Sequence, residues 1–304
     1  MQTRRAFITR LAIAVVVPIT LVVGIASCAS APSDARWAGG VGGGTGSPAS
    51  APTSAAASTG APTSSPTQGR HGDDVPSPTP GRTPSSPPTG DYLARVPRFG
   101  PRPHANPIHL PNGEKAAWLS RIPTDQPVAF LTIDDGWVKR PEALPLLRRA
   151  DVPVTLFLTI NAIHDNPAYF QQLRDAGAVI EAHTITHTKL VGKSYDVQRH
   201  EVCGSADQLA TMFGRRPHLF RPPAGEKDAT TLQAVHDCGL RAAFSWKETV
   251  DKGIVRFQAP ATAVQRGDII LMHFRDRFVD DFIAALQAIK NAGLVPAQLE
   301  DYID

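Results

Sequence analysis

From about residue 96 onward, short apolar runs alternate with segments in which apolar residues recur every three or four positions. The runs predict buried strands, and the other segments predict amphipathic helices. The expected strands are residues 128–133, 152–160, 178–182, 218–221, 240–246 and 269–273. The expected helices are residues 140–150, 166–176, 196–213, 228–237 and a last helix from residue 278 that ends at Gly293. This alternation predicts one α/β domain, residues 96–304, with a mainly parallel sheet or barrel.

The start of the chain has a different pattern. Thr3-Arg4-Arg5-Ala6-Phe7 resembles a twin-arginine export motif, an uncharged apolar run follows, and Ile25-Ala26-Ser27-Cys28 resembles a bacterial lipobox. We therefore expect residues 1–27 to be a lipoprotein signal peptide and Cys28 to be lipidated. An uncleaved anchor is the alternative, because residues 11–33 contain no charge. Both interpretations put the remaining chain outside the cytoplasm, on the outer face of the membrane or in the cell wall.

Between this segment and the domain the composition is of low complexity. Of the 62 residues from 29 to 90, 51 are Ala, Gly, Pro, Ser or Thr, with no apolar period that could face a core. We expect residues 28–95 to be a disordered linker that tethers the domain to the membrane.

Charge excludes one class of partner. The formal net charge is +3, and Arg4, Arg5 and Arg10 account for all of it, so the remaining chain is close to neutral. Binding to phosphate backbones requires a surplus of Lys and Arg on one face. We therefore expect no nucleic-acid partner, and we expect a monomer.

Polar residues follow several of the apolar runs directly. In parallel α/β folds, reactive side chains collect where strands end, so these residues are expected to converge on one rim. They are Asp134, Asp135, His183, His187, Arg221 and His273.

These residue types suit metal-assisted hydrolysis. Adjacent carboxylates repel one another and need a cation or a proton nearby. One aspartate with His183 and His187 makes a three-ligand site for a divalent ion with an open position, as in catalytic zinc sites. The second aspartate, kept ionised by Arg221, can act as a general base, and His273 can protonate a leaving group.

Each of these features alone has an ordinary structural explanation. Two histidines four residues apart are more often surface or hydrogen-bonded groups than metal ligands, and Asp-Asp-Gly is usually a turn. The seven other histidines fit structural or surface roles. It is the occurrence of all these residues at successive strand ends that favours an enzyme.

Four motifs together resemble the polysaccharide deacetylases, also called carbohydrate esterase family four or the NodB-homology domain. The resemblance covers about residues 125–300 and rests on Thr132-Ile133-Asp134-Asp135-Gly136, His183-Thr-x-x-His187, Arg221-Pro-Pro-Ala-Gly225 and Leu271-Met272-His273. It implies a distorted (β/α) barrel of about seven parallel strands.

The resemblance also implies a role for each residue. Asp134 is the base, and Asp135, His183 and His187 hold one divalent metal ion, most plausibly zinc. Arg221 holds the base in place, and the backbone amide of Ala224 faces the oxyanion. His273 is the acid, and Leu271 lines the acetyl pocket. The implied reaction is hydrolysis of an acetamide on a sugar by metal-bound water.

Two departures from the family pattern concern the groove. The family usually has tyrosine where Ala224 stands, so one aromatic wall is absent. It also has a fourth motif with a tryptophan and an aspartate that tunes the acid histidine. Residues 244–251 contain Trp246, which can wall the groove, while Glu248, Asp251 and Asp268 are all candidates for the tuning role.

Two cysteines lie on consecutive expected helices. An exported domain permits oxidation, so Cys203 and Cys238 are a candidate disulfide. Two small buried thiols are the alternative, because sequence spacing does not show whether the Cα atoms are within bonding range.

These observations lead to one main functional hypothesis. We expect an exported, lipid-anchored, metal-dependent deacetylase that removes acetyl groups from N-acetylated cell-wall polysaccharide, such as peptidoglycan or a chitin-like polymer. One alternative is an esterase that removes O-acetyl groups from xylan or another glycan. The other is a non-catalytic carbohydrate-binding lipoprotein that has kept the barrel.

Overall fold

The computed structural model describes residues 91–258 and 260–304. The expected signal peptide 1–27, the lipidated Cys28 and all but the last residues of the expected linker 28–95 lie outside the described residues. Within the described part of the chain, no helix has both the length and the apolar character needed to cross a membrane.

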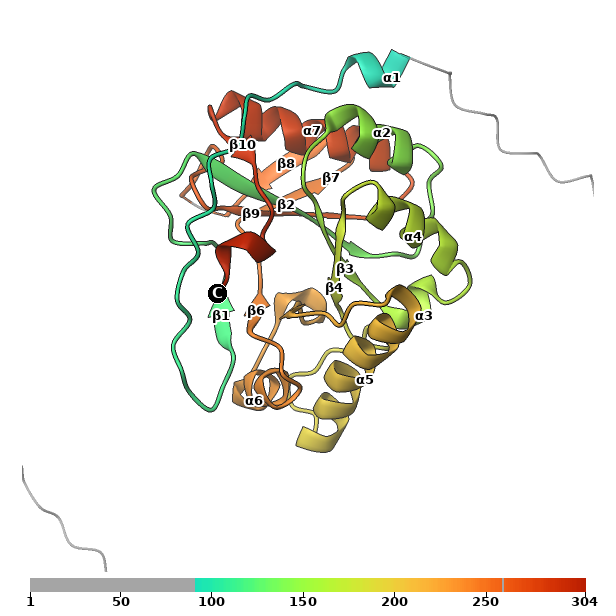
Figure 1. The fold of residues 1–304 in the computed structure, drawn as a ribbon, viewed down its shortest axis with the longest axis vertical. Helices are drawn as coiled ribbons and strands as arrows, with labels where there is room; N and C mark the ends of the chain where they lie inside the picture. Colours follow the sequence, from blue (N-terminus) through green and yellow to red (C-terminus); the bar gives the residue numbers. More distant parts are fainter. Residues whose placement is uncertain (1–90, 259) are drawn as a thin grey trace, which may run out of the picture. The chain divides into compact units, whose positions relative to one another are not determined.

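Helices and strands alternate along most of the described chain (Figure 1). The strands are β1 (Ala117–Leu119), β2 (Val128–Asp135), β3 (Thr155–Leu158), β4 (Val179–Ala182), β5 (Leu219–Phe220), β6 (Ala242–Phe244), β7 (Glu248–Asp251), β8 (Ile254–Phe257), β9 (Ile269–His273) and β10 (Val295–Pro296). The helices are α1 (Asp91–Ala94), α2 (Ala143–Ala150), α3 (Ile160–Ile163), α4 (Pro167–Asp175), α5 (Tyr195–Phe213), α6 (Ala229–Asp237) and α7 (Phe278–Asn291), with 3-10 turns η1 (Pro223–Gly225) and η2 (Glu300–Tyr302).

The sheet curls into an incomplete barrel. Its order is β1-β6-β5-β4-β3-β2-β9-β7-β8, and β10 pairs with the start of β2. All of these pairs are parallel except β7–β8. Only three residues separate β6 from β7, and the Ile122 amide after β1 donates to the Gly267 carbonyl before β9 at 2.8 Å, so the sheet curls back toward itself. This confirms the predicted distorted barrel.

The structure adds elements that the apolar pattern did not predict. β1 is short and only partly buried, and β10 has two residues, so neither leaves a clear apolar run. The β7–β8 hairpin turns at Lys252 and Gly253, which both have positive φ, as a two-residue hairpin loop requires. The expected strand 152–160 was too long, because β3 ends at Leu158 and α3 begins at Ile160.

Successive side chains of β2 point in turn to two different hydrophobic cores. Val128 and Phe130 point into the barrel, where they pack with residues such as Phe157, Phe244 and Tyr302. Ala129, Leu131 and Ile133 instead join the larger core beneath the helices. Because successive strand residues face opposite sides, the inward row continues through Thr132 to Asp134.

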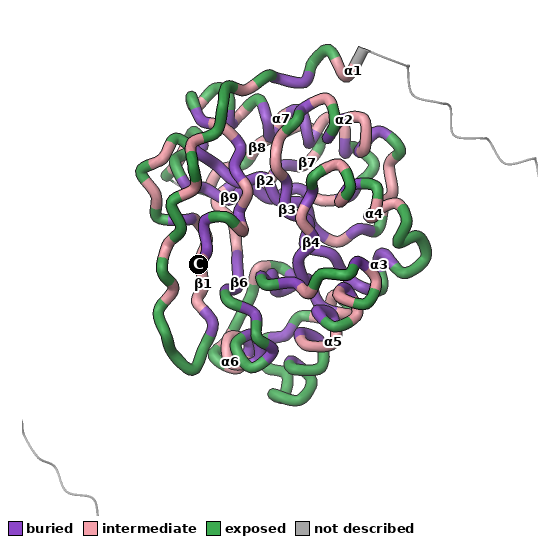
Figure 2. Tube along the Cα trace, viewed as in Figure 1, coloured by how far each residue is buried: buried purple, intermediate pink, exposed green. Residues whose placement is uncertain are grey.

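The helices cover the outside of the curled sheet (Figure 1). Contacts run from α7 to α2 and from α2 to α4, and α5 contacts both α3 and α6. The strands β2, β3 and β4 are largely buried, whereas exposed residues dominate the outer surfaces (Figure 2). A parallel sheet covered in this way explains why its strands are continuous apolar runs.

A disulfide joins α5 to the end of α6. The structure links Cys203 to Cys238, whose Cα atoms are 5.0 Å apart. The two helices also share a hydrogen bond from the buried Thr231 hydroxyl to Gln198, at 2.7 Å. Of the two alternatives left open by the sequence, the structure therefore has the bonded pair.

A buried carboxyl group lies inside the barrel near the amino-terminal ends of the strands. Glu300 accepts a hydrogen bond from the Thr155 hydroxyl at 3.0 Å, and its other oxygen is buried without a hydrogen-bond partner among the described residues. Glu181 is close by and accepts hydrogen bonds from Arg215 and from two backbone amides. Burial, followed by the charge of Glu181, raises the pKa of Glu300 to about 8.

This raised pKa predicts a stability that falls with pH. Between about 4.5 and about 8 the folded protein keeps a proton on Glu300 that the unfolded chain has released. The free energy of unfolding is therefore highest at the acidic end of this window and falls by a few kcal/mol as pH rises through about 8. Glu300→Gln should make this decline shallower by the share that Glu300 contributes, as measured by urea unfolding at pH 5, 7 and 9. Glu114→Gln, at an exposed site, is the control, and parallel pH profiles for all three proteins would contradict the prediction.

Candidate metal and catalytic site

A pocket of about 360 Å³ opens at the carboxyl-terminal ends of the strands. The two aspartates end β2, His183 follows β4, Arg221 follows β5 and His273 ends β9. The structure thus brings together the residues that the sequence placed at strand ends. The pocket is lined by Asp134, Asp135, His183, His187, Ala224, Trp246, Leu271 and His273, with Thr249, Val250, Asp251 and Arg275.

The backbone at Asp135 explains how neighbouring aspartates reach the same pocket. In a regular strand their side chains would point to opposite faces of the sheet. Asp135 instead has φ of 75°, a left-handed conformation that side chains other than glycine adopt only at a cost of about 1–3 kcal/mol. This turn of the backbone puts both carboxylates beside His183: its Nε2 atom is 3.7 Å from Asp134 Oδ2 and 3.4 Å from Asp135 Oδ1.

Arg221 is a completely buried cation beneath the pocket. Its Nη1 atom donates to Asp134 Oδ1 at 2.7 Å and to the Thr132 hydroxyl at 2.8 Å. The guanidinium lies 4.3 Å above the centre of the Phe157 ring, and Trp246 lies on its other flank at 5.7 Å. Such a pair is stable only because charge, hydrogen bonds and ring faces together replace water. Arg221 therefore pairs with Asp134 and holds its carboxylate in one orientation.

The loop that carries both histidines is held by hydrogen bonds from several elements. Glu201 of α5 accepts from the Ile185 and Thr186 amides, both at 2.9 Å, and from the Thr186 hydroxyl. The Thr184 hydroxyl accepts from the His187 amide at 3.0 Å. Thr184 and His187 both have positive φ, so the loop stays in a strained shape that these bonds enforce.

The donor set of Asp135, His183 and His187 fits a divalent metal ion. The three donor atoms lie within 4.8 Å of one another. The His183 Nδ1 atom faces the Arg221 carbonyl at 2.6 Å and must donate to it, so Nε2 presents a lone pair to the pocket. That lone pair faces Asp135 Oδ1, a buried oxygen without a hydrogen-bond partner among the described residues. Two acceptors facing each other indicate a cation between them, and one carboxylate with two imidazoles suits zinc.

The charges around the pocket act on Asp135 and His273 in different ways. Burial raises the pKa of Asp135, but the two neighbouring histidines, His183 and His187, outweigh it and leave that pKa well below its usual range. Burial also lowers the pKa of His273, and the charges of Asp134 and Asp135 oppose that effect only in part. His273 stands opposite Asp134 in the β2–β9 register, so the two groups flank the same space.

The structure separates the three carboxylates considered as partners of His273. Glu248 lies against Asp268, near the start of β9 and so at the opposite end of that strand from His273. Burial and the charge of Asp268 raise the pKa of Glu248 to about 9. Asp251 alone of the three lines the pocket, where it accepts a hydrogen bond from Arg275 at 3.3 Å.

The groove wall depends on a glycine. Ala224 is exposed at the pocket with φ of 61°, and Gly225 after it has φ of 64°. A Cβ atom on Gly225 would come within 2.6 Å of the Trp246 ring, so only glycine allows this close approach. Leu271 points to the same pocket from β9.

Several residues at the site were not among those the sequence suggested. Thr132 and Glu201 position other site residues, and Thr249 and Arg275 line the pocket. Arg275 follows His273 by two residues, so the strand-end rule could have included it. Nothing in the sequence marks Glu201, which lies within a long helix 14 residues beyond His187.

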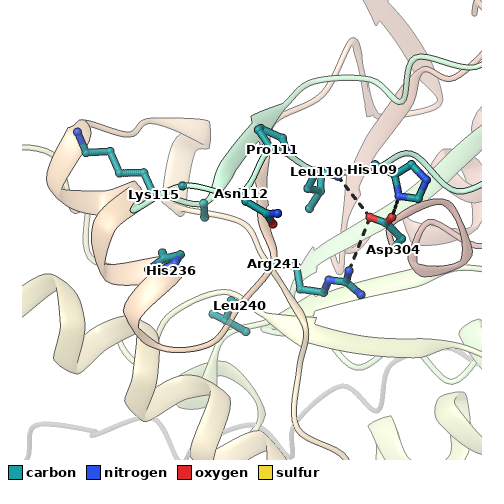
Figure 3. Close-up of a pocket in the computed structure, with 11 residues that line it drawn as sticks. His109, Leu110, Pro111, Asn112, Lys115, His236, Leu240, Arg241 and Asp304 are labelled. Atoms are coloured by element: carbon teal, nitrogen blue, oxygen red, sulfur yellow. Dashed lines mark hydrogen bonds and ion pairs between the residues drawn. The ribbon is translucent and has the colours of Figure 1, made fainter.

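A larger cavity lies elsewhere on the molecule. It has a volume of about 820 Å³ and is lined by the segment from His109 to Ala116 together with Arg241, Asp304 and the end of α6 (Figure 3). Asp304 binds His109, the Leu110 amide and Arg241 there. Arg241 precedes β6, so this cavity lies toward the amino-terminal ends of the strands, and it lacks the three converging metal donors.

Comparison with known proteins points to one family. The sequence profile described as "Polysaccharide deacetylase" matches residues 121–243. An uncharacterized protein of Streptomyces coelicolor is 38% identical over 192 residues, which cover 61% of this chain and 76% of that protein. The peptidoglycan-N-acetylmuramic acid deacetylase of Bacillus subtilis is 26% identical over 139 residues, covering 43% of this chain and 53% of that enzyme.

A solved structure shares the fold. A CE4 family pseudoenzyme from Bacillus anthracis superposes with a TM-score of 0.54 at 19% sequence identity, over 62% of this chain and 69% of that one. At this identity the likeness shows the fold alone.

The donor geometry predicts that the protein binds zinc through His183. Zinc at 100 times its dissociation constant should stabilise the wild-type chain by about 2.7 kcal/mol. His183→Ala should weaken binding by about 100-fold or more, because a three-ligand site loses one ligand. Isothermal titration and thermal melts check both statements. His236→Ala, in the larger cavity, should bind like the wild type, and equal affinity in all three proteins would place the metal elsewhere.

Proposed function

Because the chain belongs to the polysaccharide deacetylase family, we propose that it is a metal-dependent hydrolase that removes N-acetyl groups from cell-wall polysaccharide. The observation that carries this proposal is the presence, in one pocket, of a buried carboxylate paired with an arginine and of a separate set of three metal donors. A base and a Lewis acid beside the same small cavity are what amide hydrolysis by water requires.

Each residue then has a distinct task. A divalent ion bound by Asp135, His183 and His187 would polarise the acetyl carbonyl and make water more acidic. Asp134 accepts a proton from the attacking water, and Arg221 keeps that carboxylate ionised and aimed at the pocket. The backbone amide of Ala224 donates to the oxygen on which negative charge develops. His273 gives a proton to the leaving nitrogen. Each turnover therefore adds one proton to Asp134 and removes one from His273, and exchange with solvent restores both residues.

The lining of the pocket supports an acetylated sugar as the substrate. Leu271 supplies an apolar wall, and Trp246 provides an aromatic face of the kind on which sugar rings stack. The departures from the family pattern leave this arrangement intact, because the amide of Ala224 does not depend on its side chain. The smaller side chain does open the groove on that side.

We propose the cell wall as the place of action. The export motif, Cys28 and the linker in the sequence support a domain tethered outside the membrane. The Bacillus subtilis relative is a peptidoglycan-N-acetylmuramic acid deacetylase, which supports an N-acetylated polymer over an O-acetylated one.

The central prediction concerns the base. Asp134→Asn should lower kcat for acetate release by at least about 1000-fold, because the amide accepts no proton, while zinc affinity stays within a few-fold of the wild type. Acetate release and zinc titration on the same preparations test this. Asp165→Asn, at an exposed ion pair with Lys139, is the matched control. Full turnover by Asp134→Asn would reject the assignment.

A substrate panel decides between the proposal and its alternatives. Peptidoglycan, chitooligosaccharides and acetylxylan should be compared with added zinc, alongside His183→Ala. Release from the first two that disappears in His183→Ala supports the N-deacetylase. Release from acetylxylan alone supports an O-acetyl esterase, and glycan binding without any release supports a binding protein.

A further inference from the structure

We infer that Arg275 selects substrates whose acetylated sugar also carries a carboxylate, as N-acetylmuramic acid does, over the neutral N-acetylglucosamine. This inference rests on the proposed function, because it concerns the same pocket. It adds a specificity residue and a class of sugar to that function.

Arg275 supplies the pocket wall with an accessible cation. It lies two residues beyond His273, lines the same pocket, and its charge acts to lower the pKa of His273, which shows that the two groups are close. Its side chain is 49% exposed, whereas Arg221 is entirely buried and committed to Asp134. Within the described part of this pocket, Arg275 is therefore the basic side chain with donors left to offer an anion.

Asp251 orients Arg275 but leaves most of its hydrogen-bond donors free. A single bond of 3.3 Å joins Arg275 Nη1 to Asp251 Oδ1, and both side chains are partly exposed. A guanidinium has five N–H donors in a rigid fork, so most of them stay free. An exposed ion pair of this kind contributes little stability, and an incoming carboxylate can share the guanidinium with Asp251.

The β7–β8 hairpin, which carries Asp251, is held in place by neighbouring elements, so the Asp251–Arg275 pair has a defined position at the pocket. Asp251 ends β7, which pairs with β9, and the Gly253 amide in the turn donates to the buried Asp281 of α7 at 2.7 Å. The hairpin is thus fixed at both β9 and α7. Arg275 lies between β9 and α7, and its carbonyl accepts a hydrogen bond of 3.1 Å from the Phe278 amide at the start of α7.

The chemistry of the two sugars makes the distinction measurable. N-acetylmuramic acid differs from N-acetylglucosamine by a lactyl ether on the carbon next to the acetamido group, and this ether ends in a carboxylate. A carboxylate so close to the scissile amide falls within reach of a cation at the same pocket. Arginine matches a carboxylate with two parallel hydrogen bonds.

Peptide-free glycan strands of peptidoglycan provide both sugars in one substrate. After limited digestion by the enzyme with added zinc, the amines that deacetylation has freed are labelled with fluorodinitrobenzene. Acid hydrolysis, which removes every remaining acetyl group, and mass spectrometry then give the ratio of labelled muramic acid to labelled glucosamine. The wild type should favour muramic acid, and Arg275→Gln should lower this ratio by about tenfold. Arg275→Lys should recover part of it, and Arg275→Glu should lower it further. Arg277→Gln is the matched control, since Arg277 also pairs with an aspartate, Asp280, but does not line the pocket.

Strands whose lactyl carboxylates have been reduced to alcohols complete a double-mutant cycle. The effect of Arg275→Gln on the ratio should vanish on these strands, because the charged partner is gone. An equal loss on native and reduced strands would make Arg275 a general groove residue and overturn the inference. A wild type that prefers glucosamine would also overturn it while leaving the deacetylase function intact. Release from neither sugar by the wild type would reject the proposed function itself.

Discussion

The buried ion pair between Arg221 and Asp134 is the interaction on which the site depends. A guanidinium without exposed surface is tolerated only where every neighbour compensates for lost water. Thr132, the Ser245 carbonyl and the rings of Phe157 and Trp246 do so, and the Arg221 carbonyl fixes the orientation of His183. The proposed base, one proposed metal donor and the groove wall are therefore parts of one network. Removal of either charge would leave its partner buried at a cost of about 3–5 kcal/mol.

The barrel interior is layered along its axis. Charged and polar groups occupy both ends, with Glu181 and Glu300 at one and the catalytic network at the other, and aromatic side chains fill the middle. Phe157 belongs to that middle layer and also supports Arg221 from below. The apolar layer thereby keeps the two sets of charges apart, which lets the protonation of Glu300 influence stability without directly contacting the chemistry.

Much of the fold and site could be predicted from the sequence, because strands covered on both faces leave apolar runs and reactive groups follow them directly. The identity of Asp134, His183 and Arg221 as neighbours follows from that rule. The β7–β8 hairpin could not be predicted, since its edge strand alternates between exposed and half-buried residues and lacks an apolar run. The role of Glu201 depends on a contact between α5 and a loop. The separation of Glu248 from His273 depends on strand register. Neither can be predicted from the local pattern of apolar and polar residues.

Four of the six non-glycine residues with positive φ in the described chain lie at this site: Asp135, Thr184, His187 and Ala224. Together they hold several kcal/mol of conformational strain that serves only the geometry of the pocket. A lineage released from selection for catalysis would gain stability by placing glycine or asparagine at these positions. In a chain with the proposed function, substitutions that relieve this strain would stabilise the fold and disturb the pocket, so stability and activity are expected to oppose each other at these four positions.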